Sequence, residues 1–176
     1  FAVGQTYIID VTFPANATKD ITVNATNIAK DGAYYAQQTG DVSAEYIMPK
    51  NGVITIPAKD NSGKTFRITA AGATNYTLGG EIQKLLVNHP TVENITASSV
   101  KLAEVEIHAA TALTTLNVSK NNLKTINVTN ATALETLNIS ENPEFASFSG
   151  GLPQTLTSLD MHGNNLKIVD EVWDLS

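Results

Sequence analysis

Hydrophobic residues in the first 78 positions recur at every second residue in several short runs. The clearest run places Ile9, Val11 and Phe13 on one side of an extended segment. Such alternation is typical of a β-strand with one buried face. The runs cover residues 7–13, 21–25, 53–56 and 66–69. Turn-forming residues such as Lys30-Asp31-Gly32 separate them. The pattern therefore predicts a small antiparallel β-sandwich over residues 1–78.

The second half of the chain repeats itself every 21–22 residues. The pattern Leu-x-x-Leu-x-Val-x-x-Asn begins at Leu113, returns at Leu134 with Ile in place of Val, and returns at Leu156 with Met there. A fixed period of this length is typical of a solenoid, in which each repeat forms one turn and packs on its neighbours. We expect about four turns from residue 91 onward. Their first strands should cover 95–97, 116–118, 137–139 and 159–161, opposite shorter strands at 105–107, 126–128 and Phe148.

A short segment between these two patterns has apolar residues at helical spacing. Ile82, Leu85 and Leu86 lie within the sequence EIQKLLVN, and Pro90 follows it. This spacing predicts a capping helix at about 81–88, at the start of a second domain that covers residues 79–176. The predicted fold is mainly β with little helix: a β-sandwich (Ig-like) domain followed by a short solenoid.

The repeat has a family resemblance as well as a period. The run from Leu116 to Asn142, LNVSKNNLKTINVTNATALETLNISEN, resembles the leucine-rich repeats of secreted and surface proteins from gut bacteria. Such proteins often carry a β-rich module ahead of the repeats. The resemblance implies export, often with a lipid anchor upstream, and an interaction or adhesion role. Its partner would be a host or cell-surface protein or glycan.

Composition narrows the functional classes. The net charge is −6, from 11 basic and 17 acidic residues, and there is no run of Lys and Arg. This balance argues against nucleic acid or an anionic membrane as the partner. The absence of Cys excludes disulfides and thiolate metal sites. The apolar runs are too short for a membrane span. Many small polar residues and a start at Phe1 favour a secreted or outer-surface protein.

The outward positions of the repeat strands are the main candidate binding site. Because side chains alternate faces along a strand, these positions line one surface. They are Thr115, Asn117, Ser119, Thr136, Asn138, Ser140, Ser158, Asp160 and His162. The surface lacks the Trp, Tyr and Arg anchors that protein interfaces usually centre on. It is either a site of polar recognition or a solvated scaffold.

Two further sets of residues complete the candidate sites. Tyr34 and Tyr35 lie in a segment with little pattern, where they are either anchors on an exposed loop or part of the sandwich core. Asn121, Asn142 and Asn164 recur at one position of the repeat. We expect these asparagines to turn inward and bond the backbone of adjacent turns.

Residues capable of catalysis are sparse. Glu104, Glu106 and His108 alternate and so point the same way, and such a set could do acid–base work or bind a metal. We expect them to form a solvated face without a pocket, and we predict no catalytic residue, metal or cofactor. The predicted function is non-catalytic recognition or adhesion, and the alternative is a structural spacer that displays another domain. A glycan hydrolase using Glu104 and Glu106 would need a cleft around them.

Overall fold

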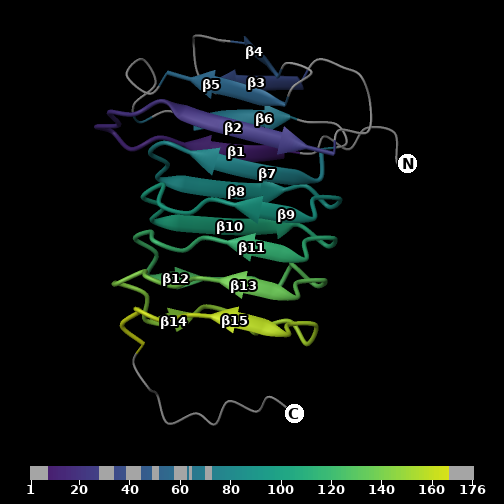
Figure 1. Cartoon of the computed structure of the whole chain (residues 1–176), viewed down its shortest axis with the longest axis vertical. Coiled ribbons are helices and arrows are strands. Elements are labelled where there is room, and N and C mark those ends of the chain that lie inside the picture. Colours follow the sequence, from purple (N-terminus) through teal and green to yellow (C-terminus); the bar gives the residue numbers. More distant parts are fainter. Residues whose placement is uncertain are drawn as a thin grey trace.

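The computed structural model describes residues 8–27, 34–38, 45–48, 52–57, 63, 65–69 and 73–166. These residues form fifteen strands in three sheets and contain no helix (Figure 1), which confirms the mainly β fold class. No helix of this part of the chain is therefore long and apolar enough to cross a membrane. The strands are β1 (Ile8–Thr12), β2 (Ile21–Thr26), β3 (Tyr34–Gln38), β4 (Glu45–Met48), β5 (Val53–Ile56), β6 (Thr65–Thr69), β7 (Asn75–Gly79), β8 (Lys84–Asn88), β9 (Asn94–Thr96), β10 (Glu104–Ala109), β11 (Thr115–Asn117), β12 (Thr125–Ile126), β13 (Thr136–Asn138), β14 (Ser147–Phe148) and β15 (Ser158–Asp160).

The N-terminal part is a sandwich of two antiparallel layers. One layer has the order β8-β1-β6-β3-β4 and the other has the order β7-β2-β5. Strand β2 alternates strictly between buried and exposed residues, as its sequence predicts. Phe13 and Phe66 meet edge to face between the layers, with ring centroids 5.2 Å apart. The predicted sandwich is therefore present, and its strands β1, β2, β5 and β6 coincide with the predicted runs to within one residue.

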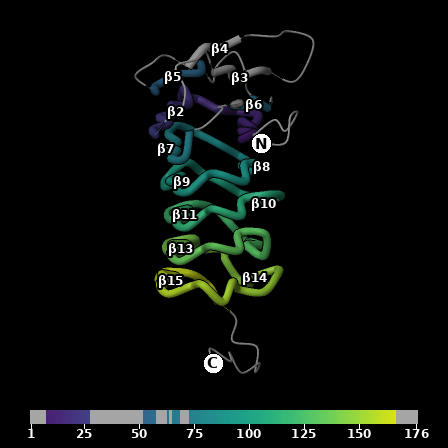
Figure 2. Tube along the Cα trace, turned by 90° about the vertical axis from the view of Figure 1, so that its right-hand side faces the viewer, coloured from purple at the N-terminus to yellow at the C-terminus, as the bar shows by residue number. Residues whose placement is uncertain are grey.

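The C-terminal part is a solenoid, as the repeat predicts. Strands β9, β11, β13 and β15 stack in parallel on one side, while β10, β12 and β14 lie on the other (Figure 2). Leu116 faces Leu137 across the β11–β13 pair. Each repeat contains the same tight backbone turn. In it, the backbone amide of Leu113, Leu134 or Leu156 donates a hydrogen bond to the carbonyl three residues earlier. The 21–22-residue period of the leucines therefore corresponds to one structural repeat of the solenoid.

Strands β7 and β8 join the two parts. Strand β7 pairs antiparallel with β2 and parallel with β9. Strand β8 pairs antiparallel with β1 and parallel with β10. Both large sheets are therefore continuous across residue 79. The predicted division into domains at residues 1–78 and 79–176 concerns independent folding, and it stays a prediction.

The predicted capping helix at 81–88 is wrong, because this segment contains strand β8. Leu85 and Val87 are buried, whereas Lys84 and Leu86 are only half-buried, so the segment alternates as a strand does. Over eight residues the apolar spacing fits a helix or a strand equally well. Backbone pairing with β1 on one side and β10 on the other decides for the strand.

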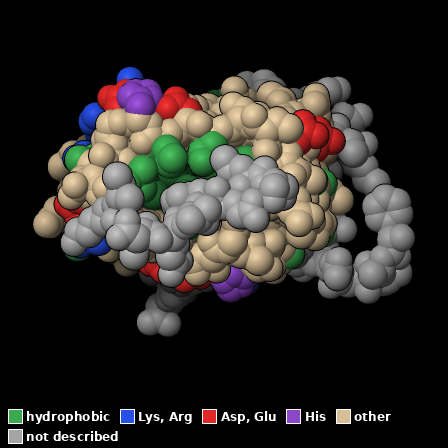
Figure 3. All heavy atoms as spheres, turned by 90° about the horizontal axis from the view of Figure 1, so that it is seen from below, with side chains coloured by type: hydrophobic (Ala, Val, Ile, Leu, Met, Phe, Trp, Pro, Cys, Tyr) green, Lys and Arg blue, Asp and Glu red, His purple; other side chains and the backbone are tan. Residues whose placement is uncertain are grey.

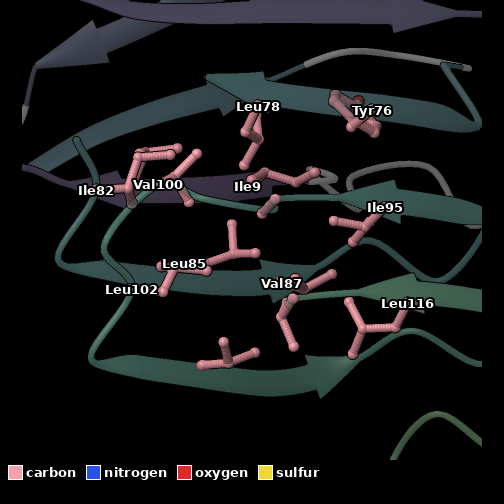
Figure 4. Packing of buried hydrophobic residues seen from close by; sticks show 14 of the residues in the cluster. Ile9, Tyr76, Leu78, Ile82, Leu85, Val87, Ile95, Val100, Leu102 and Leu116 are labelled. Atoms are coloured by element: carbon pink, nitrogen blue, oxygen red, sulfur yellow. The ribbon is translucent and has the colours of Figure 1, made fainter. Parts of the chain in front are cut away.

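One hydrophobic core runs through both parts. Figure 4 shows Ile9 of β1 and Leu78 of β7 beside Leu85 of β8, with Ile95 and Leu116 following toward the repeats. All five side chains are at most 3% exposed. The sandwich and the first turns of the solenoid therefore share a single packed interior, and the repeat sheet rests on a rigid base.

Glu81 reinforces this junction. Its side chain is only 4% exposed. Oε2 accepts a hydrogen bond of 2.7 Å from the amide of Thr18, and Oε1 accepts one of 2.6 Å from Lys101 Nζ. The bond from Lys101, together with the one from Thr18, lowers the pKa of Glu81 from 4.5 to about 2. Glu81 thus joins a loop of the sandwich to the first turn of the repeats.

We expect an acid-dependent loss of stability that belongs to Glu81. A carboxylate whose pKa is lower in the folded state stabilises the fold above pH 4.5, and this contribution disappears as the pH falls toward about 2. Glu81→Gln should lower the free energy of unfolding at neutral pH and flatten its decrease over this range. Urea unfolding at a series of pH values measures this. The exposed Glu135→Gln is the control, and equal pH profiles for E81Q and E135Q would contradict the assignment.

Candidate functional site

Six of the predicted side chains form two rows across the parallel strands of the repeat sheet. In each row, strand pairing places the residues of β11, β13 and β15 side by side. All six are partly or fully exposed. They are Thr115, Thr136 and Ser158 in one row and Asn117, Asn138 and Asp160 in the other. We call these six residues the polar strip.

The two rows continue toward the sandwich. Asn94 and Thr96 of β9 lie in register with Thr115 and Asn117. Strand β7 adds Asn75 and Thr77 to the same rows. The side-chain amide nitrogen of Asn94 donates a hydrogen bond to Asn75 Oδ1, so neighbouring side chains bond each other along a row. The repeat face is therefore a continuous polar surface that extends beyond the residues of the strip.

Ser119 and Ser140 do not belong to this surface, contrary to the sequence prediction. They are only 5% and 3% exposed. Ser119 Oγ donates to Asn117 Oδ1 over 2.8 Å, and Ser140 Oγ donates to Asn138 Oδ1 over 2.7 Å. The strands end at the asparagines, and the backbone amides of Ser119 and Ser140 also donate to Oδ1 of Asn117 and Asn138, over 3.1 Å and 3.0 Å. The serines therefore orient the asparagine side chains, and the amide nitrogens of Asn117 and Asn138 are the donors available to a ligand.

The last turn replaces this serine with histidine. His162 Nδ1 lies 2.6 Å from Asp160 Oδ1, and His162 Nε2 lies 3.9 Å from Glu141 Oε1. The hydrogen bond from His162 lowers the pKa of Asp160. The strip thus changes from neutral to charged at β15. Among the residues described, no group of three or more His, Cys, Asp or Glu side chains is arranged to hold a metal ion.

The recurring asparagines lie inside the solenoid. Asn121 Oδ1 accepts bonds of 3.0 Å from the amides of Val100 and Leu102 in the preceding turn. Its Nδ2 donates to three carbonyls, including that of Ala97 at 2.8 Å. Asn142 Oδ1 accepts from the Leu123 amide over 3.0 Å, and Asn164 Oδ1 accepts from the Asn142 amide over 2.8 Å. These side chains supply partners for buried backbone groups and are not part of a binding surface.

The structure distinguishes between the two alternatives for Tyr34 and Tyr35, an exposed loop or the sandwich, at the level of the backbone. Tyr34 and Tyr35 lie on strand β3, where Tyr34 pairs with Met48 and Tyr35 with Ile47 of β4. The backbone at these residues is therefore not an exposed loop but part of a sheet of the sandwich. Their side chains lie outside the described part of the structure.

The opposite face carries the charged set Glu104, Glu106 and His108 on β10. Lys84 Nζ of β8 lies 3.2 Å from Glu104 Oε1 and also bonds Glu106. His108 Nε2 lies 3.1 Å from Glu106 Oε2. The bond from Lys84 lowers the pKa of Glu106, so that this carboxyl is held ionised. The three side chains therefore do face the same way, as predicted, and they form one network with Lys84.

An open hollow lies beside this network, where the sequence predicted no pocket. It has a volume of about 340 Å³, and Glu106, Lys124 and Asn127 are among the residues that line it. The hollow exists because β10 is the edge of its sheet, while β12 and β14 form a separate two-stranded sheet. Strand β10 also shifts register between Ile107 and Ala109. The only signal in the sequence is that the alternating run in AEVEIHA is longer than its counterpart in the next turn.

Comparison with known proteins adds no relative to this description. No protein-family model matches the chain, no curated protein matches it, and no solved structure matches it. The two faces of the solenoid are therefore the features from which a function can be proposed.

Proposed function

We propose that the chain is a non-catalytic extracellular module that recognises a protein or a glycan through the polar strip. The observation that carries this proposal is the pair of exposed polar rows. Neighbouring strands of a sheet are roughly 4.8 Å apart, and residues two apart on one strand are separated by roughly 6.6 Å. The strip therefore offers hydrogen-bonding groups on a regular lattice, which suits shallow contact at several points.

The architecture supports recognition over catalysis. Stacked repeats form extended surfaces on which many weak contacts add up. Behind the strip, the buried Ser119 and Ser140 hold the side chains of Asn117 and Asn138 in one orientation, which lowers the entropy that a ligand must remove on binding. The resemblance of residues 116–142 to secreted leucine-rich repeats supports placement of this module outside the cell.

The hollow beside Glu106 provides the cleft that the glycan-hydrolase alternative requires, but its carboxylates do not suit the role of general acid. A glycosidase needs one carboxylic acid that stays protonated at its working pH. Lys84 favours the ionised form of Glu106, which is the opposite of what a general acid requires. Glu104 bonds the same lysine and has a side chain that is 54% exposed. We therefore keep the polar strip as the functional surface.

The test is binding of the chain to an array that carries glycans and cell-surface proteins. The variant is Asn117→Lys, Asn138→Lys and Asp160→Lys together. The control variant, Thr125→Lys, Glu144→Lys and Ser147→Lys, adds the same charge on the side of β12 and β14, where all three residues are exposed. We expect the strip variant to bind at least about 10-fold more weakly, a loss of roughly 1.4 kcal/mol.

Two outcomes of this test would count against the proposal. A hit that survives in the strip variant but is lost in the control variant would move the site to the side of the hollow. An array without any hit would favour the spacer hypothesis, in which the repeats hold another domain away from the surface.

A further inference from the structure

The last turn of the solenoid leaves apolar side chains partly uncovered. Figure 3 shows apolar side chains at the centre of this end. In the preceding turn, Leu134, Leu137 and Ile139 are all 0% exposed. The residues at the same positions of the last turn are only partly buried. With their neighbours, these partly buried residues are Phe148, Leu152, Leu156, Leu159, Met161 and Leu166.

The hydrogen bonding of polar groups at this end is incomplete as well. Asn142 Nδ2 donates to three carbonyl oxygens, including that of Ile139 at 2.9 Å. Its counterpart Asn164 has a buried Nδ2 with no hydrogen-bond partner in the described part of the chain. A buried donor without a partner is costly, so native structures rarely leave one. The seven-stranded sheet also ends here at β15, and the two-stranded sheet ends here at β14. The end therefore lacks one covering layer.

The chain itself continues from this point. The described residues stop at Leu166, which is one of the uncovered residues, and residues 167–176 follow. The sequence Asn164-Asn165-Leu166-Lys167 repeats Asn121-Asn122-Leu123-Lys124. The segment contains Ile168, Val169, Val172, Trp173 and Leu175. It begins at the uncovered surface and carries the apolar residues needed to cover it.

We propose that the open end of the solenoid is a docking surface for the chain's own C-terminal segment, residues 167–176, with Trp173 against the apolar residues of the last turn. The fit has two parts: apolar side chains meet an apolar surface, and the segment's backbone carbonyls can accept from Asn164 Nδ2. Docking also blocks the outer edges of β14 and β15, which would otherwise be open to pairing with another chain. This inference does not depend on what the polar strip binds.

Trp173 is the only tryptophan of the chain and therefore reports on the segment directly. The first measurement is acrylamide quenching of tryptophan fluorescence in the full chain, folded and in urea, over a wide range of protein concentrations. We expect several-fold weaker quenching in the folded chain and a blue-shifted emission, both independent of protein concentration. Equal quenching in both states would overturn the proposal. Protection that appears only as the concentration rises would also overturn it, because the occupant would then be a second copy.

A pair of variants locates the docking surface. Met161→Asp places a charge on the uncovered end, and Val53→Asp places the same charge on β5, where Val53 is 38% exposed. We expect M161D to raise the quenching of Trp173 toward the value in urea and V53D to leave it unchanged. Circular dichroism checks that M161D keeps its strands, and if it does not, the wild-type quenching alone decides. Unchanged quenching in a folded M161D would contradict the proposed surface.

Discussion

Replacing Asn121 with alanine should lower the free energy of unfolding by about 4 kcal/mol. The substitution leaves the amides of Val100 and Leu102 without the side-chain oxygen that both now share. Each buried donor without a partner costs about 1–3 kcal/mol. The lost bonds from Nδ2 to Ala97 and two further carbonyls add to this cost. Urea unfolding followed by circular dichroism measures the change.

The neighbouring residue supplies a matched control. Asn122 is the same amino acid one position later, but its side chain is exposed. Its backbone amide bonds the Leu102 carbonyl, and alanine keeps that bond. Asn122→Ala should therefore change the free energy of unfolding by less than about 0.5 kcal/mol. Equal losses of unfolding free energy in the two variants would contradict this account. They would show that both asparagines stabilise the local backbone of their own repeat, and that hydrogen bonds between repeats contribute little.

Gly80→Ala should cost a similar amount, about 4 kcal/mol, for a different reason. Gly80 has a φ of 106°, which residues with a side chain rarely adopt. A Cβ at this position would lie 2.3 Å from the carbonyl oxygen of Asp20 and 2.8 Å from Ile21 Cα. Both are backbone atoms next to or within β2, so they cannot move aside without disturbing the sheet. Thermal unfolding and urea unfolding should agree on the loss.

Gly151→Ala is the control for this substitution. A Cβ at Gly151 would meet no atom within 4 Å. Both substitutions restrict the unfolded chain equally, so the difference between them isolates the strain in the folded state. We expect G151A to stay within about 0.5 kcal/mol of the wild-type chain. A mild G80A variant would mean that the crossing between β7 and β8 can shift, and that the junction is less rigid than the packing implies.

The repeat itself could be read from the sequence because each turn obeys the same local rule. The leucine positions fix which side chains enter the core, and strands β11 and β13 contain Leu116 and Leu137 as predicted, although each begins and ends one residue earlier than the predicted 116–118 and 137–139. Stacking identical turns adds no long-range uncertainty, since each turn contacts only its neighbours. The same reasoning explains why the asparagine position, which recurs with the leucines, could be assigned to the interior.

The rule that side chains alternate faces along a strand gave a wrong prediction just beyond the ends of β11 and β13. Ser119 and Ser140 were predicted to face outward because they lie two residues after Asn117 and Asn138. The strands stop at the asparagines, and the backbone amides of Ser119 and Ser140 donate to Oδ1 of Asn117 and Asn138. An asparagine that bonds the backbone two residues later forms a turn, so alternation along a strand no longer applies to the serines. Strand length was the missing information, and a short repeat does not reveal it.

Features that depend on pairing between distant segments were also hidden. Residues 84–88 become a strand because β1 and β10 flank them, and β1 is far away in the sequence. The hollow beside Glu106 arises where β10 and β12 belong to different sheets. Neither fact follows from local propensity, because the same residues could form a helix or a continuous sheet.

The central claim is that the polar strip recognises a ligand, and amide chemical-shift mapping tests it most directly. The chain would be labelled with ¹⁵N and titrated with the strongest hit from the glycan and protein array. The account predicts shifts concentrated at Thr115–Asn117 and Thr136–Asn138 and decreasing toward β10. Shifts concentrated at Glu104–Ala109 and Lys124–Asn127, with β11 and β13 unchanged, would contradict the account and assign recognition to the hollow on the opposite face.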